Sequence, residues 1–177
     1  MTLYQSVLDQ TFDALPTPVK RFHAMTHKHR YKGHAKIERG AHPLARLTCA
    51  VIGFPKPGER VPVEVTIAPS KLGELWTRNF AGKRFSSFQA AGFARDAGLI
   101  VESFGPIRVV LELRLEHGRL FLHPRRWSLL GLPLPKALLP GGNTYEAELD
   151  GQFHFHVEIT APFMGLIVSY KGKLTPA

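Results

Sequence analysis

The sequence predicts a mainly β fold of the α+β kind, an antiparallel β-barrel or strongly curved sheet of about nine or ten strands. Helical spacing of apolar residues is confined to residues 1–25 and one short insert. After residue 30 apolar and polar residues alternate along most of the chain, and this part contains two hairpin-turn signals. Helices segregated from a run of strands are typical of an antiparallel sheet with a helical cover. We expect one domain over residues 1–177, with a helical front at 1–25 and the sheet at 30–177.

The front of the chain has the pattern of two short helices. Thr2 and Gln5 have the spacing of a capping box, and apolar residues follow at helical intervals until Pro16. Thr17 is predicted to cap a second helix, with Pro18 at its first position.

After residue 30 the pattern changes to strands with one inserted helix. We predict a strand at 30–39, the inserted helix at 43–54 and a turn at Pro55–Gly58. Further strands are predicted at 61–67, 74–80, 83–88, 98–104, 107–116, 119–127, 144–149, 152–160 and 165–174.

Two of these strand pairs carry two-residue turn signals. His117-Gly118 joins a hairpin in which Leu115 lies opposite Leu120, so that both strands bury the same face. Asp150-Gly151 joins a second hairpin and is among the strongest short hairpin signals. These turns set the register of part of the sheet.

The composition is that of a globular domain. The chain is 44% hydrophobic and 21% charged, unlike a disordered protein. Its single cysteine, Cys49, excludes an internal disulfide and lacks the paired spacing of a zinc site. Residues 1–5 do not begin a signal-peptide pattern, and no apolar run approaches the ~20 residues of a membrane span, so we expect a cytoplasmic protein.

Five stretches, taken together, resemble one bacterial family. They are Gly73–Phe80 (GELWTRNF), Glu102–Pro106 (ESFGP), Leu130–Pro135 (LGLPLP), Asp150–Phe155 (DGQFHF) and Gly165–Gly172 (GLIVSYKG). The chain resembles the family catalogued as domain of unknown function 4166, in the right order over nearly its whole length. The family has no established activity, and its members stand alone or are joined to a nucleotide-binding reductase-like domain. This chain has no glycine-rich phosphate loop, so it resembles the stand-alone type, and the resemblance implies by analogy a role beside the metabolism of a small or lipid-like molecule.

An arginine lies within a row of aromatic residues and forms the first candidate site. Trp76, Arg78 and Phe80 share one face of a strand by alternation, and the turn that follows places Phe85 opposite Arg78. On a later strand Glu102 is in phase with apolar neighbours. The candidate ligand-binding residues are Trp76, Arg78, Phe80, Phe85, Glu102 and Phe104.

Two interpretations of this row remain open. In the first, Arg78 and Glu102 form an ion pair inside or at the rim of the sheet, which is weak support for any activity. In the second, Arg78 stacks on the rings and binds the anionic group of an apolar ligand inside the barrel.

The second candidate is the alternating trio His154, His156 and Glu158. Two histidines and a carboxylate are ligand types that zinc accepts, but no fourth ligand is evident. The alternative is the solvated face of an amphipathic strand, and the sequence favours that alternative. We expect no metal and no cofactor.

The net charge of +9 is concentrated near the front. Segment 20–46 holds eight lysines and arginines and five of the nine histidines, with Glu38 as its only acid. This segment is either a solvated basic surface or a contact for an anionic membrane or acidic ligand. Nucleic acid is the less favoured partner, because no nucleic-acid-binding motif accompanies the charge.

Two apolar segments, 44–54 and 129–139, lack obvious core periodicity. Either they cover an end of the barrel from inside the core, or they are exposed and form a portal that meets a membrane or admits a lipid.

Three functions follow from these patterns. The first is non-enzymatic binding of an apolar or lipid-like ligand with an anionic group inside the curved sheet. The second is an isomerase- or hydrolase-type enzyme using the same pocket, with Glu102 or a histidine as general base. The third is a peripheral membrane or protein-docking module that uses the basic segment 20–46.

Overall fold

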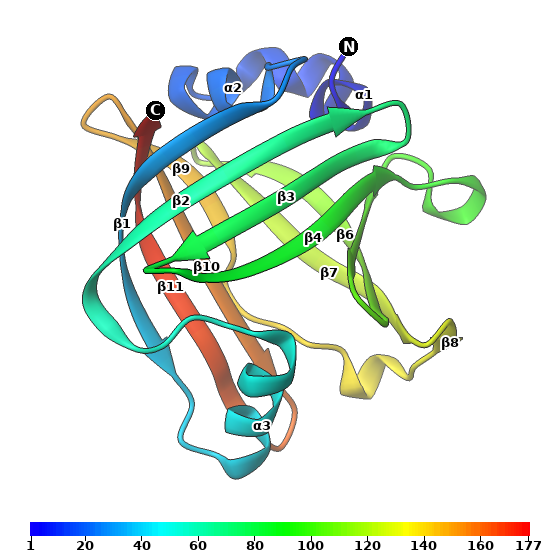
Figure 1. Cartoon of the computed structure of the whole chain (residues 1–177). Helices are drawn as coiled ribbons and strands as arrows, with labels where there is room; N and C mark the ends of the chain where they lie inside the picture. The colour runs from blue at the N-terminus through cyan, green and yellow to red at the C-terminus, as the bar shows by residue number, and fades with distance from the viewer.

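Ten strands close into one antiparallel β-barrel, which confirms the predicted fold class (Figure 1). The computed structural model describes residues 1–177. The sheet runs in the order β6-β5-β4-β3-β2-β1-β11-β10-β9-β7, and pairing of β6 with β7 closes it, while the short β8 pairs only with β7. Closure leaves no long unpaired edge on the sheet.

The elements follow the predicted order. The strands are β1 His29–Arg39, β2 Gly58–Ser70, β3 Gly73–Phe80, β4 Lys83–Ala91, β5 Ile100–Phe104, β6 Ile107–Glu116, β7 Arg119–Leu129, β8 Leu132–Pro133, β9 Tyr145–Leu149, β10 Gln152–Ala161 and β11 Gly165–Pro176. The helices are α1 Leu3–Leu8, α2 Thr17–His23 and α3 Pro43–Ile52, with 3₁₀ turns η1 Asp9–Ala14, η2 Ala94–Asp96 and η3 Lys136–Leu138.

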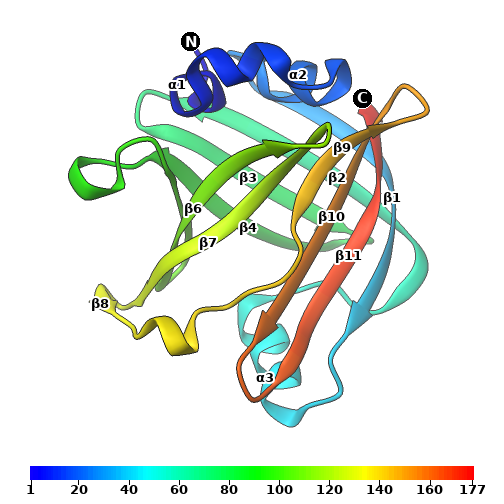
Figure 2. The same cartoon turned by 180° about the vertical axis from the view of Figure 1, so that it is seen from behind.

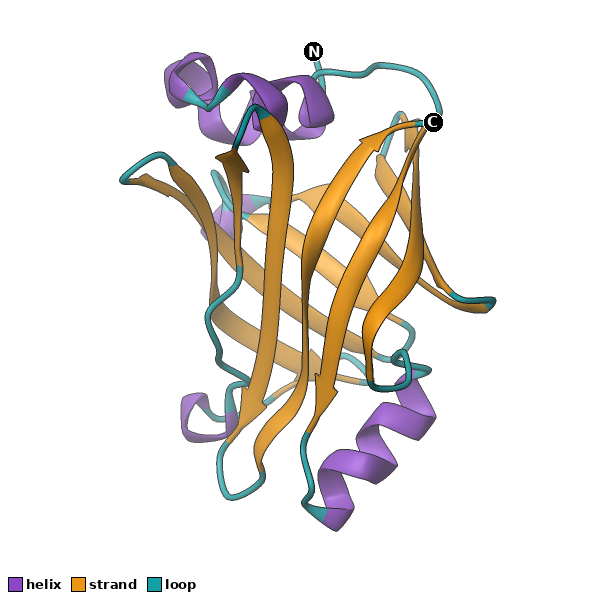
Figure 3. Ribbon diagram, turned by 90° about the vertical axis from the view of Figure 1, so that its left-hand side faces the viewer, coloured by secondary structure: helices purple, strands orange, loops and turns teal.

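The front helices cover one end of the barrel (Figure 3). The capping box of Thr2 and Gln5 is present, but α1 ends at Leu8 and the chain continues as the 3₁₀ turn η1. The predicted cap of α2 was wrong by one residue: Pro16 is the N-cap and Thr17 is already helical, with no side-chain cap hydrogen bond. A proline in the first turn is tolerated because no intrahelical donor is needed there.

Both predicted hairpins are confirmed. Leu115 pairs with Leu120 across the His117-Gly118 turn. At the other turn Asp150 has φ 51° and Gly151 has φ 72°, as a two-residue type I′ turn requires.

The first and last strands of the barrel approach closely. β1 pairs with β11 over nine residue pairs, and a Cβ added at Gly33 would lie 1.8 Å from the carbonyl oxygen of Lys173. Only glycine fits this position without moving one of the two strands.

The weakest seam of the barrel lies between β7 and β9, which pair through only three residue pairs. Beyond these pairs segment 130–144 crosses the open side, and a bridge between Gly141 and Thr160 ties it to β10 (Figure 2). Within the segment Leu130 is 77% exposed and Leu132 is 70% exposed. Of the two arrangements considered for residues 129–139, the structure therefore has the exposed one at these leucines.

The inserted helix α3 lies at the end of the barrel opposite the front helices (Figures 1 and 3). It ends two residues before the predicted boundary, because Gly53 adopts the left-handed conformation with φ 83°. Cys49 lies on the buried face of α3, and its Sγ donates to the carbonyl oxygen of Ile167 at 3.3 Å. None of the helices is both long and apolar enough to span a membrane.

Candidate functional site

The interior of the barrel contains a cavity of about 160 Å³. Apolar side chains form most of its wall, and aromatic rings are prominent among them. The rings are those of Tyr4, Phe22, Phe54, Trp76, Phe80, Phe104, Tyr145, Phe153, Phe155 and Tyr170. A concave apolar wall with a few polar groups is typical of a small-molecule site.

The main polar feature of the wall is a chain of hydrogen bonds across three strands. Arg78 Nη1 donates to Ser87 Oγ at 2.8 Å, and Ser87 Oγ donates to Glu102 Oε1 at 2.6 Å. Arg78 Nη2 also donates directly to Glu102 Oε1 at 3.4 Å. The side chains of Arg78 and Glu102 are 13% and 9% exposed, so this is a largely buried ion pair.

Two aromatic rings flank the guanidinium of Arg78. Its Cζ lies 5.1 Å from the ring centroid of Trp76 and 5.5 Å from that of Phe85, within the range of cation–π attraction. Arg78 and Phe85 are directly opposite in the β3–β4 pairing, as the alternation and turn predicted. The sheet thus fixes the guanidinium against the wall instead of leaving it mobile in the cavity.

Five of the six predicted ligand-binding residues line the cavity. These are Trp76, Arg78, Phe80, Glu102 and Phe104. Phe85 is buried behind them, where its ring packs edge-on to Phe54 at 5.5 Å and stacks with Phe80 at 6.0 Å. Phe85 therefore supports the wall and does not face the cavity.

A second cluster of polar side chains lies where the front helices α1 and α2 meet the barrel. His23 Nε2 is 2.5 Å from Glu146 Oε2, and both side chains are buried. The ring of Tyr4 stacks on His23 at 3.6 Å, and its hydroxyl donates to Gln89 Oε1 at 3.1 Å. Tyr4, Gln89 and Glu146 line the cavity, so this cluster forms the part of the cavity wall nearest the front helices.

Three buried carboxylates face this interior. Glu74 accepts a hydrogen bond from Trp76 Nε1 at 3.2 Å, and Glu102 and Glu146 have the partners already described. Burial raises the pKa of Tyr4 well above its ordinary value, and Glu146, Glu102 and Glu74 raise it further. Arg78 is therefore not a lone positive charge inside the barrel.

Tyr170 faces the same cluster from the opposite wall. Burial raises its pKa to about 12, with Arg78 lowering it and Glu102 raising it by smaller amounts. This tyrosine remains a neutral donor at physiological pH.

Sequence reasoning missed His23, Glu74 and Glu146. Glu74 is in phase with Trp76, so alternation along β3 already indicated the interior. Glu146 pairs with Phe155, and the register of the Asp150-Gly151 turn carried that signal. Nothing in the sequence indicated His23, because its position depends on how α2 packs on the barrel.

The trio His154, His156 and Glu158 lies on β10 facing away from the alternate Phe and Val side chains. No group of three or more His, Cys, Asp or Glu side chains is arranged to hold a metal ion, and this trio forms none. Partial burial lowers the pKa of His154 and of His156, and the paired residues Lys173 and Lys171 lower them further. The arrangement is that of a half-covered outer face.

The basic segment 20–46 does not form one surface. Lys36 contacts Glu38 and Glu59 at 3.1 and 3.2 Å, and Arg30 is 3.7 Å from Glu64. Arg39 donates to the carbonyl oxygens of residues 54 and 55. Much of the positive charge therefore has partners on neighbouring strands or loops.

Comparison with known proteins identifies one family and no characterised relative. A family described as "Domain of unknown function (DUF4166)" matches residues 15–174. No curated protein matches the chain. The matched range covers α2 and all strands of the barrel except the last two residues of β11.

Proposed function

The chain belongs to the family described as domain of unknown function DUF4166, and since membership carries no activity with it, we propose a function from the barrel interior: this protein binds a small apolar ligand inside the barrel. The observation that carries the proposal is an aromatic-walled cavity inside the barrel with the Arg78–Glu102 pair on its wall.

The size of the cavity limits the ligand. An apolar cavity of about 150 Å³ holds benzene. The space of about 160 Å³ therefore accepts a ring or short chain of similar size. A longer lipid-like ligand requires movement of the wall, and the segment that crosses the β7–β9 seam is the part held by fewest strand pairs.

The polar end of the ligand is proposed to lie at Arg78. A guanidinium has five N–H donors, and Ser87 and Glu102 take one each here, so donors remain for a ligand oxygen. The sequence suggested an anionic end. Because Glu102 already compensates the charge of Arg78, a ligand carboxylate gains less there than at an unpaired arginine.

The direct test is native mass spectrometry of the purified protein, followed by titration with pentanol and pentanoate, which are close to benzene in size. We expect a bound small molecule, or binding of at least one probe, reported by a change in tryptophan fluorescence, since Trp76 lies in the cavity wall. Val157→Phe places a larger side chain in the cavity and should abolish binding. Val101→Phe, on the outer face of β5, is the matched control and should bind as the parent does.

Two results decide the proposal. Loss of probe binding in the Val157 variant, with the control unchanged, supports a site inside the barrel. A protein that carries no ligand and binds neither probe refutes it. Tighter binding of pentanoate than of pentanol supports the anionic end, and the reverse order excludes it.

An enzyme is the second candidate, favoured by the buried pair of His23 and Glu146 beside the cavity. A carboxylate held by an imidazole in an apolar wall is placed to take a proton from a ligand. We propose Glu146 as the base and His23 as its positioning residue. Glu102 is the weaker choice, because Arg78 and Ser87 both donate to it.

Deuterium exchange into cyclohexanone tests this candidate. Glu146 would take the proton from the carbon beside the carbonyl, leaving an enolate that recovers a deuteron from solvent. We expect exchange above the buffer rate in the parent and none above it in Glu146→Gln. Exchange at the buffer rate in both proteins rules the candidate out.

A further inference from the structure

Exposed apolar side chains gather at the α3 end of the barrel. On α3 itself Leu44 is 54% exposed, Leu47 is 59% and Val51 is 78%. Leu130, just before β8, is 77% exposed, and Leu132, the first residue of β8, is 70% exposed. Phe163, in the turn between β10 and β11, is 92% exposed, and all three segments lie around this same end (Figures 1 and 2). We call these six residues the apolar rim.

Helix α3 has an apolar face that the fold does not use. Ala45 and Cys49 face the barrel and are fully buried. Leu44, Leu47 and Val51 recur at intervals of three and four on the other side, as one face of a helix requires. Exposed leucines at this spacing usually mark a surface that contacts something else.

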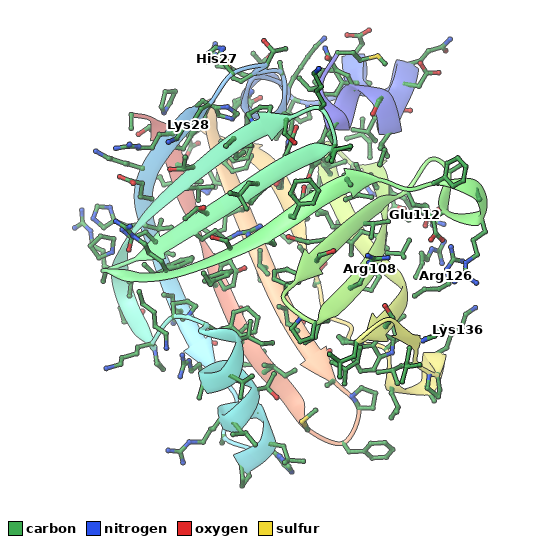
Figure 4. All side chains as sticks on the ribbon, turned by 45° about the vertical axis from the view of Figure 1, so that its right-hand side comes forward. His27, Lys28, Arg108, Glu112, Arg126 and Lys136 are labelled. Atoms are coloured by element: carbon green, nitrogen blue, oxygen red, sulfur yellow. The ribbon has the colours of Figure 1, made fainter.

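The segments that carry the apolar rim contain basic but no acidic side chains, and the exposed Glu38 and Glu59, which flank residues 40–57, both contact Lys36. Residues 40–57, 128–144 and 161–166, which contain the rim, include no aspartate or glutamate. They include three exposed basic residues, Arg46, Lys56 and Lys136. Figure 4 shows Lys136 with the segment beside β8, away from His27 and Lys28 at the helical end.

We propose that the apolar rim docks this protein on the surface of an anionic lipid bilayer. Apolar side chains that enter the acyl boundary, with cations at headgroup level, form the arrangement by which peripheral proteins bind membranes. A second copy of the chain is disfavoured as the occupant, because two rims would bring like charges together, on chains that each carry +9.

The apolar rim lies close to one part of the cavity wall, although the docking proposal does not require a ligand in the cavity. Pro140, Gly141 and Gly142 line the cavity and belong to the segment that carries Leu130 and Leu132. A docked barrel would therefore present this part of its wall close to the bilayer. Docking remains testable in a protein that binds no ligand.

The test is co-sedimentation of the full chain with vesicles of phosphatidylcholine alone and with about 30% phosphatidylserine. We expect binding to the anionic vesicles at least about tenfold stronger than to the neutral ones. Binding should weaken as NaCl rises from about 0.1 to about 0.5 M, since the Debye length falls from about 10 to about 4 Å.

A pair of double variants distinguishes docking through the apolar rim from non-specific binding by any exposed apolar side chain. Leu47→Ser with Val51→Ser should weaken binding to anionic vesicles about tenfold or more, since two apolar side chains no longer leave water. Leu72→Ser with Phe93→Ser is the matched control, because these residues are 82% and 89% exposed but lie outside the rim, and it should bind like the parent.

Three outcomes overturn the proposal. They are no binding to anionic vesicles, equal loss of binding in the rim variant and the control, and a stable dimer in solution that only the rim variant abolishes. The last would make the rim an interface between copies of this chain. Circular dichroism of each variant confirms that its barrel is folded.

Discussion

Replacing Glu102 with leucine leaves the Arg78 guanidinium inside the barrel without its carboxylate partner. At 3.4 Å and an effective dielectric constant of about 20, the attraction between the two charges is about 5 kcal/mol. Ser87 and the rings of Trp76 and Phe85 remain around Arg78, and the cavity can admit water. We therefore expect Glu102→Leu to lower the free energy of unfolding by about 3 kcal/mol, at the low end of the range for a broken buried pair.

Removing both charges should restore most of that loss. A buried ion pair pays a desolvation cost that apolar side chains do not, so Arg78→Met combined with Glu102→Leu is expected within about 1 kcal/mol of the parent. Arg78→Met alone should also destabilise, because it leaves Glu102 with only the hydroxyl of Ser87.

Urea denaturation of the parent, both single variants and the double variant measures this cycle. A loss of about 3 kcal/mol corresponds to a melting temperature lower by about 6–12 °C for a chain of this size. Glu64→Leu is the control, because Glu64 faces Arg30 on the exposed surface, and its cost should stay below about 1 kcal/mol.

If Glu102→Leu costs no more than Glu64→Leu, water already screens the Arg78 pair and the expected loss is refuted. A double variant as unstable as the two single losses combined would also refute the pairing. In that case the two charges would act independently and not as a pair.

Three further predictions concern the helical cover, the β1–β11 pairing and the outer face of the barrel. Phe22→Ala removes a ring stacked 4.1 Å from Phe153, so we expect the free energy of unfolding in urea to fall by about 3–5 kcal/mol. The variant should also bind more of an apolar dye, and unchanged dye binding would contradict the role of α2 as a cover of the barrel end. Gly33→Ala must part β1 from β11 and should cost about 3 kcal/mol or more by the same assay, whereas parent-like stability would show that the strands yield easily. Because the folded state lowers the pKa of His154 and His156, their contribution to stability is present above their ordinary pKa of about 6.5 and is lost as the pH falls below it. Replacing both with glutamine should flatten the dependence of the urea midpoint on pH between about 7 and 5, and parallel curves for variant and parent would exclude this.

Local pattern was sufficient to predict most of the elements. Alternation over two residues follows from strand geometry alone, so it placed Trp76, Arg78 and Phe80 on one face without knowledge of the partner strands. The turn at residues 81–82 then set Phe85 opposite Arg78, because a two-residue connection leaves no freedom of register. In the same way, the Asp150-Gly151 turn pairs Glu146 with Phe155 and so indicates that both side chains lie on one face.

The strand count and the end of the first helix were less well determined. The two-residue β8 lies in a proline-rich stretch and is too short to show a period of two. The change from α1 to the 3₁₀ turn η1 keeps nearly the same spacing of apolar residues, so the sequence pattern does not distinguish the two.

By itself, then, the sequence determined the order of the strands, the hairpin registers and which side chains share a face, because each depends on neighbours in the chain. Only the tertiary structure decided that β7 meets β9 and that β1 meets β11, which are contacts between segments distant in the chain. Those closures enclose the cavity, whose wall comes from strands all around the barrel. They also leave one face of α3 in solvent, because helical spacing shows where the apolar faces of a helix lie but not which of them the barrel covers.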